Sequence, residues 1–227
     1  MKNNFIVAID GPAGAGKSTL ARKLAEKSGF AYLNTGQLYR SLALFVSDNG
    51  QSCDDEAEVE NLLPQFTLER MNRCMARQDE ITNEIMGRGA SCVSRFPFVR
   101  EKFDKMQKEF VAAAVLPDNS PAGGVIVEGR DTGTKVFPNA DVKIFLTASQ
   151  ESRAKRRQLE LESKGMSHSF EEILETVRTR DESDINRKFG ALRIPEDGTV
   201  IDSTGMTMDQ VIDAASRLVQ DAMAARG

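Results

Sequence analysis

A glycine-rich segment near the amino terminus has the residue types and the spacing of a phosphate-binding loop. Residues 11–18 match the pattern G-x-x-x-x-G-K-[ST] at every fixed position. Glycines let a backbone approach phosphate oxygens closely, so that its inward-pointing amide N–H groups can bind them. We expect Lys17 to reach the β- and γ-phosphates and Ser18 to bind Mg²⁺. The motif therefore predicts a nucleoside triphosphate site formed by Gly11, Pro12, Ala13, Gly14, Ala15, Gly16, Lys17, Ser18 and Thr19.

The segments on either side of this loop support the interpretation. A continuous apolar run at residues 5–9 predicts a buried strand before the loop, and helical spacing at 18–28 predicts a helix after it. A chance glycine turn before a helix is the alternative, and the agreement of motif and context disfavours it. The Asn-Lys-x-Asp sequence with which small GTPases read guanine is absent from the chain, which favours ATP.

Arginine is the second residue type whose placement points to chemistry. Arg40 and Arg130 each follow a predicted strand, at the end where parallel sheets bind ligands. Farther along, Arg180, Asp184 and Arg187 recur at a spacing that puts all three on one helix face. Another predicted helix carries Arg153, Arg156 and Arg157. Each of these residues alone could be a solvated surface charge, but the set indicates a site for a second anion.

Such a set suits a reaction in which two polyanions meet. A phosphate acceptor has a second pKa of about 6, so it is mostly ionised at neutral pH and needs no general base. Two like charges ~4 Å apart repel by about 4 kcal/mol at an effective dielectric constant near 20. Arginine, lysine and Mg²⁺ would offset this repulsion and stabilise the transferred group. The protein-kinase His-Arg-Asp catalytic loop is also absent, so a phosphate acceptor explains the residues better than an alcohol.

The elements that must position these residues alternate between strand and helix. Apolar runs predict strands at residues 5–9, 30–33, 125–127, 142–146 and 200–202. Periodicity predicts helices at 18–28, 37–49, 52–63, 98–115, 149–163, 169–188 and from 207 onward, and glycine and proline predict a loop at 117–124. Capping-box pairs begin three helices, namely Ser52 with Asp55, Ser169 with Glu172 and Thr207 with Gln210. The alternation predicts an α/β protein of the P-loop NTPase fold, a five-stranded parallel sheet with helices on both faces.

Composition narrows the class of protein further. The chain has 227 residues, of which 40% are hydrophobic and 28% charged, as in a soluble globular domain. Its net charge of −4 argues against nucleic acid as a partner, and it contains no apolar run long enough to span a bilayer. Three widely spaced cysteines fit a reducing compartment and no disulfide framework. We therefore expect a cytoplasmic protein that does not bind membranes.

Four further motifs give the chain a resemblance to a known family over nearly its whole length. Thr35-Gly36 with Tyr39-Arg40 is similar to a T-G-x-x-Y-R segment, and residues 129–138 to G-R-D-x-G-T-x-V-F-P. Residues 180–187 are similar to R-D-x-x-D-x-N-R, and residues 202–204 to D-S-T. With the phosphate loop, these segments resemble the bacterial cytidylate kinases, which belong to the nucleoside monophosphate kinases. The resemblance implies transfer of a phosphoryl group from MgATP to CMP or dCMP by a monomer.

The resemblance also implies roles for individual residues. Lys17, Arg130, Arg157 and Arg187 would be catalytic, and Arg153 and Arg157 would belong to a mobile lid over ATP. Asp131, with Ser91 and Arg100, would read the edge of cytosine, since a carboxylate can accept from the exocyclic amine that uracil lacks. The implied CMP site comprises Thr35, Tyr39, Arg40, Ser91, Arg100, Gly129, Arg130, Asp131, Arg180, Asp184 and Arg187.

The same resemblance predicts one kinase domain, 1–227, with three parts. The core comprises about 1–63, 96–148 and 189–227. A stretch without clear periodicity at about 64–95 would be an insertion on the monophosphate side, and about 149–188 would be the helical lid. The chain departs from the family pattern at Asn34, where aspartate is usual, at Thr132, where an apolar residue is usual, and in a shortened segment at 81–95.

Two alternative functions stay open from the sequence. One is another small P-loop kinase that acts on AMP, UMP or a small alcohol, against which the segment around Asp131 argues. The other is a nucleotide-binding switch without efficient turnover, against which the arginine clusters argue. Measuring phosphoryl transfer to a panel of monophosphates distinguishes these two alternatives from a cytidylate kinase activity.

Overall fold

A computed structural model describes residues 4–114, 122–163 and 165–226 and divides into two compact units. The sheet unit consists of Met1–Leu33 and Val111–Gly227, and the helical unit of Asn34–Phe110. The helical unit includes the predicted insertion at 64–95 and extends beyond it on both sides.

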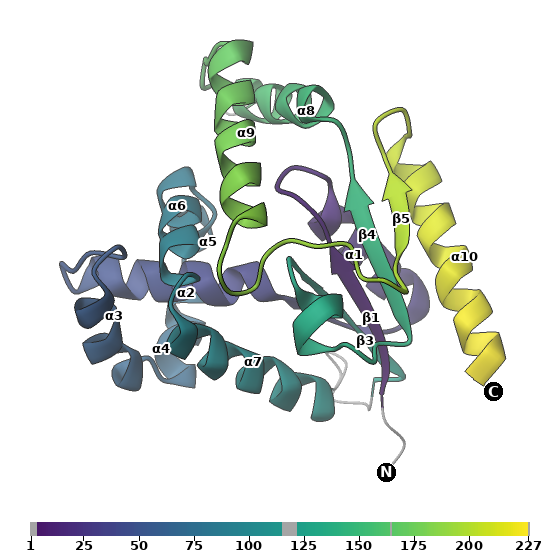
Figure 1. Ribbon diagram of the computed structural model, residues 1–227, viewed down its shortest axis with the longest axis horizontal. Helices are drawn as coiled ribbons and strands as arrows, with labels where there is room; N and C mark the ends of the chain where they lie inside the picture. The colour runs from purple at the N-terminus through teal and green to yellow at the C-terminus, as the bar shows by residue number, and fades with distance from the viewer. Residues whose placement is uncertain (1–3, 115–121, 164, 227) are drawn as a thin grey trace. The chain divides into compact units, whose positions relative to one another are not determined.

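The sheet unit contains the predicted five-stranded sheet. Its strands lie in the order β2-β3-β1-β4-β5, and every pairing recorded for β1, β3, β4 and β5 is parallel (Figure 1). The strands are β1 Phe5–Asp10, β2 Ala31–Asn34, β3 Gly124–Gly129, β4 Val142–Thr147 and β5 Thr199–Asp202. The fold class predicted from the alternation of elements is therefore confirmed.

The register of the sheet brings the ends of three strands together. Asp10 at the end of β1 lies opposite Gly129 at the end of β3 and opposite Phe145 near the end of β4. The phosphate loop and the segment that begins at Arg130 therefore leave the same edge of the sheet. This is the edge at which α/β folds bind ligands.

Both faces of the sheet are buried, which explains why its central strands are almost wholly apolar. On one face, α1 (Lys17–Ser28) and α10 (Met208–Arg226) cover Val7, Ile9 and Leu146. The other face buries Val125 and Val127 against residues of the segment that follows β3. That segment contains a single π-helical turn, Thr132–Val136.

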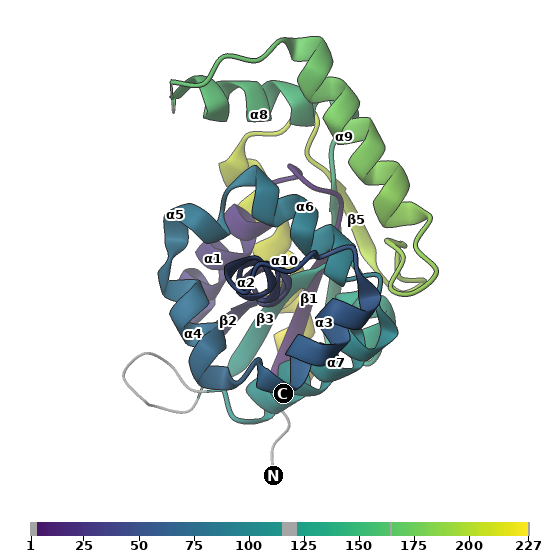
Figure 2. The same cartoon turned by 90° about the vertical axis from the view of Figure 1, so that its left-hand side faces the viewer.

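Two further helices of the sheet unit pack against each other. They are α8 (Gln150–Ser163) and α9 (Phe170–Ile185), which lie side by side (Figure 2). Ala154 and Leu161 of α8 bury Ile173 of α9. The predicted capping box of Ser169 and Glu172 is confirmed. The predicted end of this helix at 188 is wrong, because the chain leaves helical geometry at Asn186.

The helical unit is built on α2 (Thr35–Asp48). Phe66, Phe103 and Leu42 lie at the centre of its core and are almost fully buried. The remaining helices are α3 Glu56–Leu62, the 3₁₀ turn η1 Leu63–Gln65, α4 Leu68–Ala76, α5 Gln78–Ile81, α6 Glu84–Val93 and α7 Pro97–Ala112.

Residues 64–95, predicted to be irregular, are largely helical. Gly87 and Gly89 suggested breaks, but both lie inside α6. Glycine is needed at these two positions because neighbouring side chains occupy the space that a Cβ atom would take. A Cβ atom at Gly89 would lie 2.9 Å from the Cβ of Ala43, and one at Gly87 would lie 3.0 Å from a terminal nitrogen of Arg40. The glycines therefore allow close packing of α6 on α2 and do not end the helix.

The capping box of Ser52 with Asp55 is wrong, since Asp55 itself caps α3 by accepting from the Glu58 backbone N–H. The capping pair of Thr207 and Gln210 is confirmed. The predicted helix end at 115 and most of the predicted loop at 117–124 lie outside the described residues. Within 4–114, 122–163 and 165–226, no helix has the length and apolarity to cross a membrane.

Candidate active site

Three glycines of the phosphate loop, Gly11, Gly14 and Gly16, have a positive φ that other residues rarely adopt. Gly11 has φ 149°, and a Cβ atom there would lie 1.9 Å from the carbonyl oxygen of Leu146, too close for any side chain. Gly16 has φ 96° and precedes the first residue of α1, so the helix begins at Lys17, one residue earlier than predicted. The loop therefore delivers its last residues to the positive end of a helix, where anions are stabilised.

Two arginines of α8 hold carbonyl groups of this loop. The guanidinium of Arg153 donates to the carbonyl oxygen of Ala13 at 3.0 Å, and that of Arg156 donates to the carbonyl oxygen of Ala15 at 3.4 Å. Arg156 also donates to the hydroxyl and the carbonyl oxygen of Ser203. These bonds hold the backbone of the phosphate loop at Ala13 and Ala15. Sequence reasoning gave no role to Ser203, whose contacts join chain segments far apart in sequence.

Lys17 is buried, and its Nζ donates to the carbonyl oxygen of Pro12 at 2.8 Å. Burial lowers the pKa of Lys17 to about 7, and the positive charge of Arg130 acts in the same direction. Glu128, Asp184 and Asp10 oppose the shift. A phosphate group beside this amine would favour its protonated form and raise the pKa again.

The low pKa of Lys17 predicts proton uptake when ATP binds. At pH 8 an amine of pKa about 7 is about nine-tenths neutral, and a bound triphosphate should protonate it. Isothermal titration calorimetry in buffers of different ionisation enthalpy measures that uptake. We expect close to one proton at pH 8, less at pH 6, where the amine is already charged, and none for Lys17→Ala at pH 8. Equal uptake by the wild type and Lys17→Ala would contradict the assignment.

Ser18, predicted to bind Mg²⁺, lies beside an acidic residue that the sequence analysis did not single out. Its hydroxyl donates to a carboxylate oxygen of Glu128 at 2.7 Å, and Glu128 is buried at the end of β3. Hydroxyl and carboxylate oxygens are ligands that Mg²⁺ prefers, and this ion keeps several waters and phosphate oxygens in its shell. Ser18 and Glu128 therefore fit magnesium. The described residues hold no group of three or more His, Cys, Asp and Glu side chains that could hold a metal ion.

Three of the predicted acceptor residues form one charged cluster in the sheet unit. Asp184 of α9 is 1% exposed and accepts from Arg130 Nε at 2.7 Å and from a terminal nitrogen of Arg187. Burial works to raise the pKa of Asp184, but Arg130 and Arg187 outweigh it and hold the pKa below its ordinary value. Burial works to lower the pKa of Arg130, but Asp184 and Glu128 raise it above the ordinary arginine value. Arg180 also lowers the pKa of Asp184.

The cluster places an excess of positive charge beside the phosphate loop. The positive charge of Arg130 acts to lower the pKa of Lys17, and the same acids, Glu128 and Asp184, act on both groups. The loop and the cluster therefore share one electrostatic site. Arg187 lies just beyond the end of α9 and not within it, so the predicted common helix face extends only to Asp184.

Asp131 is buried directly after Arg130, at the start of the π-helical turn. Its carbonyl oxygen accepts from the backbone N–H groups of Lys135 and Val136. The turn is also anchored to Asp10 at the end of β1, a residue that the sequence analysis did not identify. Burial is the main cause that raises the pKa of Asp10, which hydrogen bonds from Gly133 and Thr132 oppose.

The predicted lid arginines make different contacts. Arg153 is almost fully buried and forms a two-pronged ion pair with Asp181 of α9, at 2.9 and 2.5 Å. Its Nε donates to the carbonyl oxygen of Ala148. Arg157 is partly exposed and pairs with Glu160 on its own helix at 2.8 Å. Arg153 therefore connects the phosphate loop to α9, and its role toward ATP stays a prediction.

The other predicted CMP residues belong to the helical unit. Arg40 donates to the carbonyl oxygens of Ile81 and Asn83, both at 2.9 Å, and lies against Gly87. The Ser91 hydroxyl donates to the Gly87 carbonyl oxygen at 3.3 Å, so Arg40 and Ser91 share one neighbourhood. The guanidinium of Arg100 stands 5.8 Å over the ring of Tyr39, and Thr35 is the buried first residue of α2.

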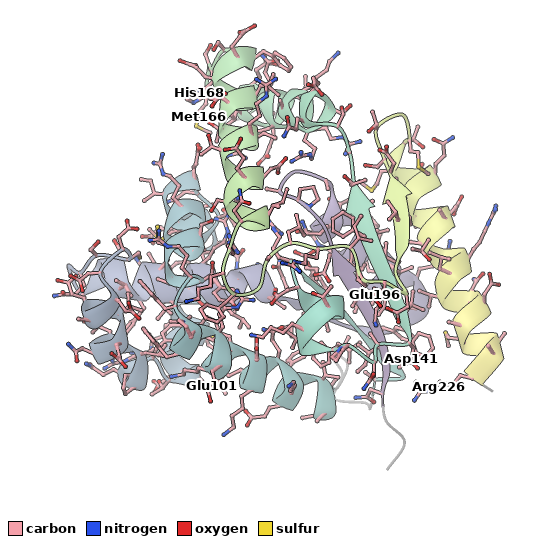
Figure 3. The ribbon with its side chains drawn as sticks, viewed as in Figure 1. Glu101, Asp141, Met166, His168, Glu196 and Arg226 are labelled. Atoms are coloured by element: carbon pink, nitrogen blue, oxygen red, sulfur yellow. The ribbon has the colours of Figure 1, made fainter. Side chains whose placement is uncertain are left out.

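Several other polar residues lie outside this site. His168, the only histidine, is exposed in the turn between α8 and α9, next to Met166 (Figure 3). Asp141 and Arg226 form an ion pair of 3.1 Å before the start of β4, at the edge of the sheet opposite the phosphate loop (Figure 3). The three cysteines are free thiols, as predicted.

Comparison with known proteins assigns the chain to a family. The family model for cytidylate kinase matches residues 7–221. The chain belongs to the cytidylate kinase family. Cytidylate kinases of an Exiguobacterium species, Thermotoga petrophila and Pasteurella multocida are 36%, 40% and 37% identical to it. The alignments cover 99%, 96% and 97% of this chain and 100%, 98% and 97% of those proteins.

Solved structures agree with the fold. A gluconokinase of Sinorhizobium meliloti has a TM-score of 0.50 at 14% identity and covers 100% of this chain and 98% of its own. An uncharacterized protein of Eubacterium ventriosum has a TM-score of 0.51 at 13% identity and covers 96% of this chain and 99% of its own. These likenesses show the fold alone. Membership of the cytidylate kinase family confirms the resemblance predicted from the motifs.

Proposed function

We propose that this chain transfers the γ-phosphoryl group of MgATP to CMP, and also to dCMP, giving ADP and the nucleoside diphosphate. The observation that carries the proposal is the cluster of Arg130, Asp184 and Arg187 beside the phosphate loop, in a chain of the cytidylate kinase family. Arginine side chains match phosphate groups with paired donors. The cluster supports an acceptor that is itself a phosphate.

The reaction needs charge neutralisation more than proton transfer. An oxygen of the CMP phosphate attacks the γ-phosphorus of ATP, and the bond from that phosphorus to the β-phosphate oxygen breaks. The electron pair leaves on ADP. The attacking oxygen is already ionised at neutral pH, so no general base is required. Lys17 and Arg130 would stabilise the charge that spreads over the transferred group.

Magnesium would be held by Ser18, with Glu128 accepting hydrogen bonds in its surroundings. When bound, the ion supplies neutralisation of phosphate charge. The residues of the helical unit that the family resemblance assigns to CMP, and Arg157 as a catalytic residue, stay part of this proposal. We also propose a cytoplasmic monomer, for which a solution mass near 25.0 kDa is the expected measurement.

Asp131 is the residue proposed to read cytosine. Its carboxylate would accept from the exocyclic amine, so Asp131→Ala should lower kcat/KM for CMP by roughly 10²-fold, the worth of a charged hydrogen bond. The KM for ATP should change little, and the preference for CMP over UMP should disappear. Steady-state kinetics with both monophosphates measure this. Equal losses toward CMP and ATP would show that Asp131 has a structural role only.

The proposed function is tested by ADP release with CMP, dCMP, UMP and AMP as acceptors. We expect rapid turnover with CMP and dCMP and a much lower kcat/KM with AMP. Comparable rates with CMP and AMP would overturn the cytosine assignment. ATP binding without turnover on any of the four would instead support a nucleotide-binding switch.

A further inference from the structure

Asp10 is a buried acid that the proposed reaction does not use. It is the last residue of β1, immediately before Gly11 of the phosphate loop, and it is 1% exposed. One carboxylate oxygen accepts from the backbone N–H of Thr132 at 2.9 Å, and the other accepts from that of Gly133 at 2.7 Å. The Thr132 side chain lies close to the same carboxylate and acts to lower its pKa.

Burial of a carboxylate is costly unless hydrogen bonds replace its lost water. Here two bonds do so, and both come from consecutive backbone amides 122 and 123 positions away in the chain. A carboxylate that accepts from two consecutive amides fixes the position of the backbone at those residues, because both hydrogen-bond distances must be satisfied together. Asp10 therefore fixes the turn at Thr132 and Gly133 relative to β1.

The two segments that Asp10 joins carry different halves of the site. The phosphate loop begins at the residue after Asp10, and Asp131 and Arg130 directly precede the anchored amides. A change in the anchor would shift Arg130 and Asp131 relative to Lys17. The site depends on this spacing, since the donor and acceptor phosphates must meet between Lys17 and Arg130.

We propose that Asp10 is a positioning residue that sets the place of Arg130 and Asp131 against the phosphate loop. The inference rests on the proposed function, since it assigns CMP to Arg130 and Asp131. Asp10 touches neither substrate in this account. It acts mainly through the Thr132–Gly133 turn, because its charge has the smallest of the named effects on the pKa of Lys17, so its loss should affect CMP much more than ATP.

Asp10→Asn is the sharpest variant because it keeps the size of the side chain. Its amide nitrogen cannot accept, so one of the two backbone N–H groups loses its partner. We expect the KM for CMP to rise by roughly 10- to 100-fold, as for loss of a hydrogen bond to a charged group, with the KM for ATP within about threefold of wild type. Steady-state kinetics with each substrate varied in turn measure this split.

Thr132 supplies a milder variant that keeps both backbone bonds. Thr132→Val removes only the hydroxyl and should raise the KM for CMP in the same direction by a smaller factor. Thr132→Ser keeps the hydroxyl, so its KM for CMP should stay near that of the wild type. This pair keeps the inference testable even if Asp10→Asn fails to fold.

Val7→Ala is the matched control for simple loss of stability. Val7 lies on β1 and is fully buried in the core cluster beneath α1 and α10, whereas Val136 of the turn belongs to a different cluster. Its replacement should lower the melting temperature and leave the KM for CMP unchanged. Hydrogen exchange of the Thr132 and Gly133 amides, which needs no activity, should accelerate in Asp10→Asn more than in Val7→Ala.

The outcomes separate this inference from the proposed function. If the wild type does not phosphorylate CMP, the proposed function fails and the inference fails with it. If the wild type is active but Asp10→Asn raises the two KM values equally, only the inference is overturned. Unchanged exchange of the two amides in Asp10→Asn would also overturn it, and a KM change confined to CMP with faster exchange supports it.

Discussion

Replacement of Lys17 by alanine is expected to lower kcat at least ~10²-fold, the effect of removing one preorganised donor from a developing charge. The amine lies in the phosphate loop, is buried and hydrogen-bonds to the carbonyl oxygen of Pro12. Loss of its charge removes one of the cations that would neutralise the transferred phosphoryl group on the donor side, where Mg²⁺ would remain. Single-turnover measurements with saturating ATP and CMP report the chemical step directly.

Two controls show whether the loss is catalytic. Lys23→Ala removes an exposed lysine of the same helix, which pairs with Glu26 at 3.4 Å, and should leave kcat unchanged. Burial disfavours the charged form of Lys17, so Lys17→Ala should melt within a few degrees of the wild type. A near-normal kcat for Lys17→Ala would remove Lys17 from the mechanism.

Arg130→Ala should lower kcat/KM for CMP by roughly 10²- to 10³-fold, because each hydrogen bond to a charged group contributes about 1.5–3 kcal/mol. Arg130 directly follows β3 and is held by Asp184 of α9. From this position Arg130 would meet the acceptor phosphate. Arg130→Lys should recover only part of the loss, since an ammonium lacks the planar paired donors of a guanidinium. Kinetics with CMP varied at saturating ATP measure both variants.

The matched control for Arg130 is Arg178→Ala. Arg178 is an exposed arginine of α9, and its removal should change neither KM nor kcat. The KM for ATP should also change much less than that for CMP in Arg130→Ala. An equal rise of both KM values would show that Arg130 organises the whole sheet edge and does not bind the acceptor.

The phosphate loop and the parallel sheet could be predicted because their signals are local. The strand before the loop is an unbroken apolar run, and Gly11 and Gly16 stand where no other residue could adopt the backbone. Burial on both faces of the sheet leaves the same signature in each central strand. The helix starts at Ser169 and Thr207 could also be predicted from local signals, because each capping pair joins residues three positions apart.

Asp10 and Glu128 could not be found in this way. Each is a single acid at the end of an apolar strand, and its partner lies more than 100 positions away in the chain. The parallel register that places Asp10 opposite Gly129 is what brings those partners together. An acid that ends a buried strand just beside a glycine-rich loop is the signal that could have identified both residues.

The helices of residues 64–95 were missed for a different reason. Gly87 and Gly89 usually indicate loops, and here they are required by the close approach of Arg40 and Ala43. Short helices such as α4 and α5 also bury few residues each, so their periodicity is weak. Their core is supplied by α2 and α7, which the local sequence does not show.

The central claim is that this site brings together two negatively charged substrates by neutralising their repulsion. A crystal structure with CMP and a non-hydrolysable ATP analogue tests it most directly. We expect the guanidinium groups of Arg130 and Arg187 to bind the CMP phosphate, with Lys17 on the γ-phosphate opposite. Guanidinium groups that face bulk solvent in that complex, with no cation opposite Lys17, would contradict the claim.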